Sequence, residues 1–423
     1  MLSAEAVILF IIAYILIMAE EKVLISKSAV ALVLGTALWV LIAIRDHAKV
    51  VPHLSETSAG IFEIIIFILA AITLVQILTH YRLFDWLRYR IARYPLNAKG
   101  QLWLMSAMAF LLSAVINNIT VAIVFTQLMR LFFKGKNLLI AASAVIIAAN
   151  AGGAFSPIGD VTTTMLWLNN KFSSAEIIQF ALAPSIVIYL ISTALLVMQL
   201  KKGQVEPPAE QDFQFLRSEK LVIGFAFGSF ALPFIVNLIG LNPYLGILFG
   251  LGITWIVIDI LRRRLPEHRS HFTASIEHFL RDADISTLQF FVGILLAVSA
   301  LDYLGILSAA SNQLLGHTPS LGRLVAGSSL MGALSALVDN VPLTAAAMEI
   351  VKTTDTSIWA LIALTVGAGG SILLIGSAAG IAAMGIVKEL TFSSYLKVAT
   401  IPALLGYAAG IGMWYLQHLT LRM

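Results

Sequence analysis

Long runs of apolar residues alternate along the chain with short clusters of charged and small polar residues. Ten of these runs approach the roughly 20 residues that a helix needs to cross a bilayer. We expect helices and not barrel strands, because barrel strands alternate apolar and polar positions over segments of about 10 residues. The predicted spans are 4–19, 24–44, 58–80, 137–168, 175–200, 219–239, 243–262, 284–304, 357–387 and 394–417.

Two further stretches, 101–134 and 320–353, are apolar on both sides of a polar centre, which reads INNIT in the first and VDNVP in the second. Each arm is shorter than the roughly 20 residues of a full crossing, so both stretches are predicted to be re-entrant hairpins. The spans 137–168 and 357–387 are too long for one simple helix and contain Gly-Gly pairs, which predicts broken helices.

The chain also repeats itself. The segment 68–78 (ILAAITLVQIL) matches 294–304 (ILLAVSALDYL), 113–122 (SAVINNITVA) matches 335–344 (SALVDNVPLT), and 150–160 (NAGGAFSPIGD) matches 367–377 (GAGGSILLIGS). The sequence Phe-Ser-Ser at 172–174 recurs at 392–394, followed in turn by Pro184 and Pro402. Blocks that recur in one order indicate an internal repeat.

Each repeat contains five spans and one hairpin, and a hairpin returns to the side from which it started. Five crossings therefore turn the second repeat upside down. We predict an all-α polytopic membrane protein with two inverted repeats, 1–200 and 219–417, joined by a linker at 201–218. Inverted repeats with interrupted helices are typical of secondary transporters whose substrate site lies near the membrane midplane.

The distribution of basic residues predicts the orientation. Of 27 Lys and Arg residues, 21 fall on the side reached after the first span and 6 on the other. The side with more Lys and Arg residues should be cytoplasmic. Both termini then lie outside, the first hairpin enters the membrane from the cytoplasm, and the second hairpin enters from outside. The amphipathic segment 82–94 should lie along the inner surface. We expect a multi-pass protein of a bacterial cytoplasmic membrane.

Composition agrees with this class. The chain is 59% hydrophobic and 12% charged, against roughly 45–50% and 25% in soluble domains. The net charge of +4 gives no reason to expect a nucleic-acid partner, and the absence of cysteine excludes disulfides and thiolate metal sites. Because the N-terminus lacks a basic region and a clear cleavage site, we expect the first span to be retained.

Four polar clusters remain inside the predicted membrane segments: 117–120, 150–164, 339–344 and 367–377. Backbone groups freed by a helix break need partners, so such breaks occur where they line a protein cavity. In 150–164, glycines and Pro157 interrupt the helix, while carbonyl and side-chain oxygens become available to a small hard cation.

Asp160 and Asp339 are the two carboxylates that we place deepest in the membrane. Inserting an ionised aspartate at this depth costs a free energy on the order of 2.5–3.5 kcal/mol, so we expect both residues to have a functional role. A single carboxylate can hold either a proton or a cation, and this competition is a physical basis for exchange. No Lys or Arg falls in a predicted span core, which favours a cationic substrate. The acidic residues Glu63, Asp259 and Asp302 lie near span ends, where they can reach water.

The motifs NAGGAFSPIGDVTTTMLW at 150–167 and SALVDNVPLTAAAM at 335–348 resemble the NhaD-type sodium/proton antiporters of the ion transporter superfamily. The resemblance implies electrogenic exchange of Na⁺, often Li⁺, for H⁺, without a cofactor, by a homodimer whose hairpin and broken-helix unit moves like an elevator. By matching position, it also implies the following ion-binding and proton-coupling residues: Asn117, Asn118, Thr120, Asn150, Asp160, Thr162, Thr163, Ser335, Asp339, Asn340, Ser371 and Ser377. The Na⁺ ligands among them would be Asp160, Asp339, Asn118, Asn340 and Asn150.

The sequence departs from this family at one position. The family usually has an Asp-Asn pair at the tip of the first hairpin, whereas this chain has Asn117-Asn118. One titratable group is therefore missing from the first hairpin, while the second hairpin keeps Asp339-Asn340.

Two alternatives remain at this point. Relatives of this architecture carry oxyanions or dicarboxylates, although their hairpin tips show Ser-Asn-Thr triplets that this chain lacks. A membrane-embedded aspartyl protease also uses two aspartates that share a proton. Such enzymes carry a Gly-x-Gly-Asp motif, and here Pro157 occupies the position of its first glycine.

Overall fold

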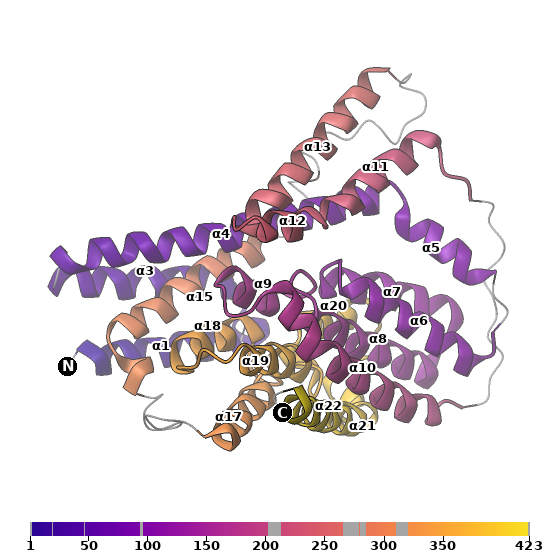
Figure 1. Cartoon of the computed structure of the whole chain (residues 1–423). Helices are drawn as coiled ribbons and strands as arrows, with labels where there is room; N and C mark the ends of the chain where they lie inside the picture. Colours follow the sequence, from indigo (N-terminus) through magenta and orange to yellow (C-terminus); the bar gives the residue numbers. More distant parts are fainter. Residues whose placement is uncertain are drawn as a thin grey trace.

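The computed structural model describes residues 2–18, 20–45, 47–93, 96–201, 213–264, 279, 285–309 and 320–421 (Figure 1). Every regular element in these residues is a helix. The helices of the first half are α1 (Leu2–Met18), α2 (Glu20–Val23), α3 (Lys27–Arg45), α4 (His47–His80), α5 (Leu83–Ala92), α6 (Ala98–Ser113), α7 (Asn118–Phe132), α8 (Gly135–Ala154), α9 (Val161–Leu168) and α10 (Ser174–Met198).

The second half contains α11 (Arg217–Ser229), α12 (Leu232–Leu238), α13 (Pro243–Arg264), α15 (Ile285–Tyr303), α17 (Leu321–Leu334), α18 (Asn340–Ile350), α19 (Thr356–Gly369), the 3-10 helix η2 (Leu374–Gly376), α20 (Ala378–Ile386), α21 (Phe392–Val398) and α22 (Thr400–Leu421). Most of the predicted linker, 202–212, lies outside the described residues.

Within the described residues, seven helical segments are long and apolar enough to cross a membrane, and the bent pair α21–α22 raises the number to eight. The chain is therefore an all-helical, multi-pass membrane protein. Ten spans were predicted, and the difference lies in α1 and α19. The apolar part of α1 is only Ser3–Met18, and α19 ends at Gly369 after 14 residues because the chain breaks there.

Three predicted spans differ in detail from the helices. Helix α4 begins at His47, well before the predicted start at residue 58, and contains Pro52. The span 219–239 is divided into α11 and α12 at residues 230–231. The span 394–417 lies in α21 and α22, which meet at an angle of 58°. Apolar patterning marked these segments, but patterning does not specify where a helix bends.

Both long glycine-containing segments are interrupted. Helices α8 and α9 are separated by residues 155–160, where Pro157 supplies no N–H group to continue the helical hydrogen bonds. Helices α19 and α20 are separated by residues 370–377, which include η2. The interruptions leave helix ends inside the protein, where backbone groups can face a polar site.

The same contacts occur at corresponding positions in the two halves. Ser113 Oγ donates to the Ala149 carbonyl oxygen at 2.6 Å, and Ser335 Oγ, 222 residues later, donates to the Val366 carbonyl oxygen at 2.8 Å. The first bond joins the end of α6 to α8, and the second joins the end of α17 to α19. Helices α8 and α19 are the two helices that precede the interruptions. This correspondence supports the internal repeat read from the sequence.

Glycines allow the same close approaches in both halves. Gly152 lies against the backbone of Phe110, and Gly369, 217 residues later, lies against the backbone of Gly332. Neither position has room for a side chain. The Gly-Gly pairs therefore bring α8 close to α6 and α19 close to α17, in addition to preceding the helix breaks.

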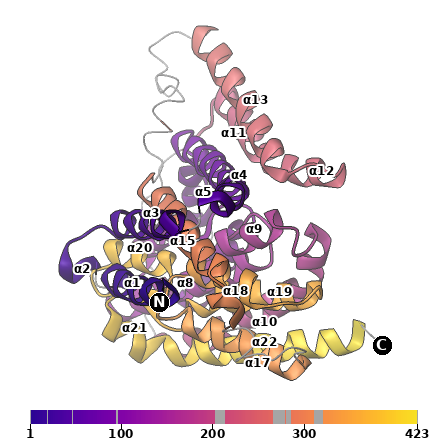
Figure 2. The same ribbon diagram turned by 90° about the vertical axis from the view of Figure 1, so that its left-hand side faces the viewer.

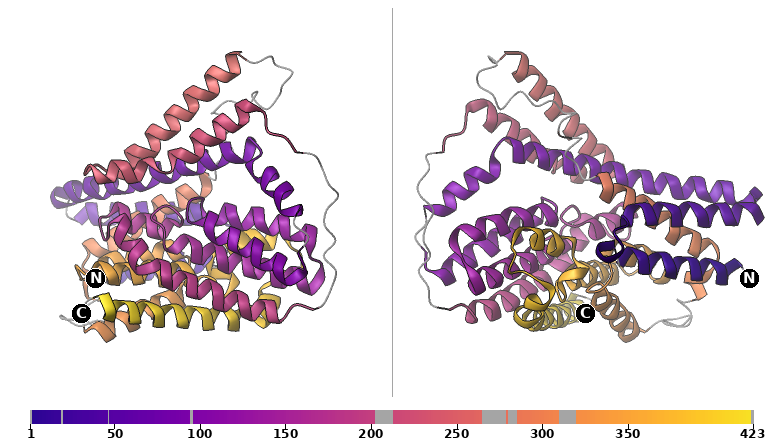
Figure 3. Two further views of the ribbon diagram at one scale, coloured as in Figure 1. Left: turned by 45° about the vertical axis from the view of Figure 1, so that its right-hand side comes forward. Right: turned by 180° about the vertical axis from the view of Figure 1, so that it is seen from behind.

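The two halves interlock around these interruptions. Helix α7 packs against α20, and α18 packs against α9, so each half contributes to the surroundings of the other half's broken helix. Around them, α10 packs along α22 and α3 along α15. Helices α11, α12 and α13 lie at one edge beside α4 (Figures 2 and 3).

Candidate ion-binding site

Asp160 lies at the start of α9, in the extended backbone that follows the break after α8, and its side chain is only 3% exposed. Its Oδ2 atom accepts a hydrogen bond from Thr162 Oγ1 at 2.5 Å, and its Oδ1 atom lies 3.3 Å from Asn118 Nδ2, which donates. The first distance is typical of a hydroxyl donating to an ionised carboxylate. Asp160 is thus a buried carboxylate surrounded by polar partners.

Asn150 connects the two halves of the chain at this point. Its Oδ1 atom accepts from Asn118 Nδ2 at 3.1 Å, and its Nδ2 atom donates to both Ser371 Oγ and Ser377 Oγ at 2.8 Å. The two serines lie in the interruption between α19 and α20. One buried amide therefore joins the broken helix of the first half to that of the second.

The resulting cluster is a set of hard oxygen ligands with one formal charge. It comprises the side chains of Asn118, Asn150, Asp160, Thr162, Ser371 and Ser377, all of them buried. Carboxylate, amide and hydroxyl oxygens suit small hard cations. Within the described residues, no group of three or more His, Asp or Glu gathers anywhere, so this cluster differs in kind from a polycarboxylate metal site.

The neighbouring threonines stabilise the break. Thr164 Oγ1 donates to the carbonyl oxygens of Pro157 and Asp160, at 2.8 and 2.9 Å, and Thr163 Oγ1 lies 3.4 Å from the Ala154 carbonyl oxygen, to which it donates. These bonds satisfy carbonyl groups that the interruption leaves without helical partners. Thr163, one of the predicted ion-binding and proton-coupling residues, thus has its hydroxyl bonded to the end of α8 in this structure.

Asp339 and Asn340 occupy a separate position at the start of α18. Asp339 Oδ1 accepts from the Val341 N–H group at 3.0 Å, which caps the helix, and both side chains are half-buried. Among the described residues, neither forms a hydrogen bond to the Asp160 cluster, although Asp339 interacts electrostatically with Asp160. The two aspartates, predicted to share one role, therefore lie in different surroundings.

Asn117 is the counterpart of Asp339 in the first half. Its Oδ1 atom accepts from the Ile119 N–H group at 2.8 Å and caps α7. Thr120 lies half-buried in the first turn of the same helix. Ser335, which was also among the predicted ion-binding and proton-coupling residues, uses its hydroxyl to bind the Val366 carbonyl oxygen and holds α17 against α19.

Sequence reasoning missed two residues that bear on the carboxylates, one by contact and one by charge. Gly367 in α19 faces Asp160: a methyl group added there would lie 2.9 Å from Asp160 Oδ2. Lys27, the first residue of α3, interacts electrostatically with Asp339. Gly367 occupies the repeat position of Asn150, so the alignment of the halves is a signal that could have found it. The sequence around Lys27 contains no motif that indicates an interaction with Asp339.

Gly367 gives a testable prediction about space at the site. In Gly367→Ala, the new methyl group would press against Asp160 Oδ2 and lie 3.3 Å from the Ala154 side chain. We expect the half-saturating Na⁺ concentration for exchange to rise about tenfold, because an oxygen ligand is crowded. Gly385→Ala in α20, where added atoms meet open space, is the control. Equal values for both variants would show that this space is not used.

A family model described as citrate transporter matches residues 14–367. The chain is 37% identical to sodium/proton antiporter 2 of Arabidopsis thaliana, over 97% of this chain and 99% of that protein. It is 32% identical to the Na⁺/H⁺ antiporter NhaD of Alkalimonas amylolytica, over 96% of this chain and 88% of that protein. The chain belongs to the NhaD-type sodium/proton antiporters.

Membership extends over nearly the whole length of this NhaD-type chain. A third relative, the Na⁺/H⁺ antiporter NhaD of Halomonas elongata, is 31% identical over 96% of this chain and 86% of that protein. The resemblance inferred from the two motifs is thereby confirmed. The match with the citrate-transporter model keeps the carboxylate alternative within the same broader group of transporters.

Proposed function

We propose that this NhaD-type protein exchanges Na⁺ for H⁺ across the bacterial cytoplasmic membrane, and that Li⁺ can replace Na⁺. The observation that carries the proposal is the buried carboxylate of Asp160, held among amide and hydroxyl groups from both halves of the chain. Full-length similarity to proteins named sodium/proton antiporters supports it.

The exchange follows from competition for Asp160. A Na⁺ ion bound by the carboxylate is favoured when the group is ionised, and protonation removes the charge that attracts the ion. Asn118 Nδ2 donates at present to both Asn150 Oδ1 and Asp160 Oδ1. When the Asn118 amide rotates, its Oδ1 atom takes the place of Nδ2. The Oδ1 atoms of Asn118, Asn150 and Asp160 can then face one cation. Proton release and ion binding are thereby coupled at one carboxylate.

Asp339 provides the second carboxylate of the proposed mechanism. Its half-buried position at the start of α18, with Lys27 and Asp160 in electrostatic range, lets it respond to the charge at the site. We propose that it completes the ion path together with Asn340. With Asn117 in place of the family's usual aspartate, Asp160 and Asp339 are the two carboxylates available for coupling.

The proposed transport movement uses the repeats. We propose inverted repeats, 1–200 and 219–417, joined by a cytoplasmic linker at 201–218, with the hairpins 101–134 and 320–353 entering from opposite sides and both termini outside. The corresponding contacts of Ser113 and Ser335 support this symmetry. In a homodimer, the unit that contains α6–α9 and α17–α20 would move against α4, α11 and α13 and carry the site across.

Everted membrane vesicles test the function. With a respiration-driven ΔpH followed by a fluorescent probe, adding Na⁺ or Li⁺ should dissipate the gradient and restore fluorescence, while K⁺ should give a weaker response. Uptake of radiolabelled citrate in right-side-out vesicles tests the alternative that the family model raises. Citrate uptake with no response to any cation between pH 6.5 and 9.5 would replace the antiporter with the carboxylate transporter.

A further inference from the structure

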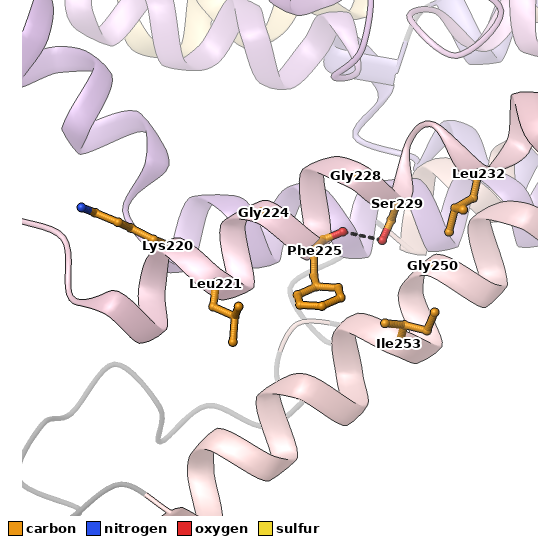
Figure 4. Close-up of a pocket in the computed structure, with 9 residues that line it drawn as sticks. All are labelled: Lys220, Leu221, Gly224, Phe225, Gly228, Ser229, Leu232, Gly250 and Ile253. Atoms are coloured by element: carbon orange, nitrogen blue, oxygen red, sulfur yellow. Dashed lines mark hydrogen bonds between the residues drawn. The ribbon is translucent and has the colours of Figure 1, made fainter.

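An apolar groove lies between α11 and α13, far along the chain from the residues of the ion site. Its volume is about 420 Å³, within the roughly 300–1,000 Å³ typical of pockets that hold a ligand of drug size. The lining residues are Lys220, Leu221, Gly224, Phe225, Gly228, Ser229, Leu232, Gly250 and Ile253 (Figure 4).

The groove is wedge-shaped because glycines bring the two helices together at one end. A methyl group added to Gly250 would lie 2.5 Å from the Ser229 side chain, and one added to Gly246 would lie 2.6 Å from the Leu232 backbone. From this crossing the helices diverge toward Lys220 (Figure 4). Ser229 Oγ is already bonded to the Phe225 carbonyl oxygen and to Thr254 Oγ1, so the narrow end presents no free hydroxyl.

The walls of the groove are apolar and face the outside of the molecule. Leu221 is 46% exposed and Phe225 is 41% exposed. Gly224 and Gly228 add no side chains, and open space lies beside both. In a membrane this space is filled by hydrocarbon, because water finds no polar partners on such walls.

The open end of the groove is positively charged. Lys220 lines it, and Arg217 lies one turn earlier on the same face of α11. The last turn of α13 is also basic, with Arg262, Arg263 and Arg264. In the part of the chain that the structure describes, neither Lys220 nor Arg217 forms an ion pair. This end is also the one that the distribution of basic residues assigns to the cytoplasm.

We infer that this groove binds one anionic phospholipid, whose acyl chain lies along Gly224 and Gly228 and whose phosphate is held by Lys220 and Arg217. Charge and shape both favour this occupant: an apolar wedge ends at two cations, which have no ion-pair partner among the described residues, on the side where anionic headgroups attract basic residues. A second copy of the chain fits less well, because a two-fold axis through the groove would bring Lys220 toward the partner's identical cation.

The inference is independent of the ion that the protein transports, and native mass spectrometry of the purified, delipidated full chain tests it. Phosphatidylglycerol or phosphatidylcholine is titrated into the detergent solution, and the retained lipid is counted. We expect one phosphatidylglycerol to bind more tightly than phosphatidylcholine. Lys220→Gln should weaken this binding about fivefold, and Gly224→Leu, which fills the groove, should abolish it.

Matched controls separate the groove from general effects. Gly252→Leu in α13, at a half-buried position with open space beside it, and Lys99→Gln at the exposed start of α6 make the same changes at sites that do not line the groove. They should leave lipid binding unchanged. Equal retention of both lipids, or unchanged binding in Gly224→Leu, would overturn the inference. Dimers that dissociate in Gly224→Leu, without any bound lipid in the native protein, would assign the groove to a second copy.

Discussion

Asp160→Asn should abolish Na⁺-dependent proton movement while leaving the protein folded and inserted. The asparagine side chain has nearly the shape of aspartate. Its amide oxygen can still accept from Asn118 Nδ2, and its amide nitrogen can donate to the Thr162 hydroxyl, reversing that bond. The substitution removes the formal charge of Asp160, which is the only one in the buried cluster. The attraction between a carboxylate and a cation in contact is several kcal/mol even at an effective dielectric constant of about 20, and each 1.4 kcal/mol or so is tenfold in affinity. We expect exchange to fall more than about 100-fold.

The measurement is the ΔpH probe signal in everted vesicles, normalised to the amount of inserted protein. Asp259→Asn, which makes the same change in α13 away from the cluster, should retain the native response. Native exchange in Asp160→Asn would remove Asp160 from the coupling mechanism. Poor insertion of the variant would show instead that the charge stabilises the fold.

Asp339→Asn should also stop exchange, and the chain itself indicates that this change is structurally mild. Asp339 caps α18 through the Val341 N–H group, and Asn117 caps α7 in the same way through Ile119. Aspartate and asparagine are comparable helix caps. The start of α18 should therefore be preserved, and the loss should report the missing charge, which interacts electrostatically with Lys27 and Asp160.

Two readouts distinguish a coupling role for Asp339 from a role in capping. Thermal stability of the purified Asp339→Asn protein should match the native value, whereas Asp339→Ala should be less stable by about 1 kcal/mol because the cap is lost. Exchange should be lost in both. Full exchange in a stable Asp339→Asn variant would leave Asp160 as the only carboxylate carrier.

The sequence predicted the helix breaks because their causes are local. Pro157 removes a helical hydrogen bond and the Gly-Gly pairs weaken the helix locally, and the structure interrupts both long segments that contain a Gly-Gly pair. The family resemblance led to Ser371 and Ser377, and both lie in the segment that matches 150–160. The structure places them against Asn150.

Other features depend on contacts between distant parts of the chain, which hydrophobic patterning does not contain. Gly367 reads as one more glycine of a membrane helix, and only its position opposite Asp160 gives it a role at the site. Ser335 and Thr163 were predicted to take part in ion binding, and the structure adds that their hydroxyl groups donate to backbone carbonyl groups. A polar residue near a helix break can bind an ion or donate a hydrogen bond to a backbone carbonyl group. Which carbonyl groups lie within reach of its side chain depends on the fold and not on the local sequence.

The central claim is that Na⁺ and H⁺ compete for the carboxylate of Asp160, and the pH dependence of KM for Na⁺ tests it most directly. Purified protein in proteoliposomes, with identical pH on both sides and ²²Na⁺ exchange as the readout, gives KM across the range from about pH 4.5 to about pH 9. Competition predicts that KM is constant while Asp160 is ionised and rises once the pH falls below the pKa of that carboxyl, approaching a tenfold increase per pH unit for each proton displaced, while the maximal exchange rate changes little. A KM that is independent of pH over this range would contradict the shared site.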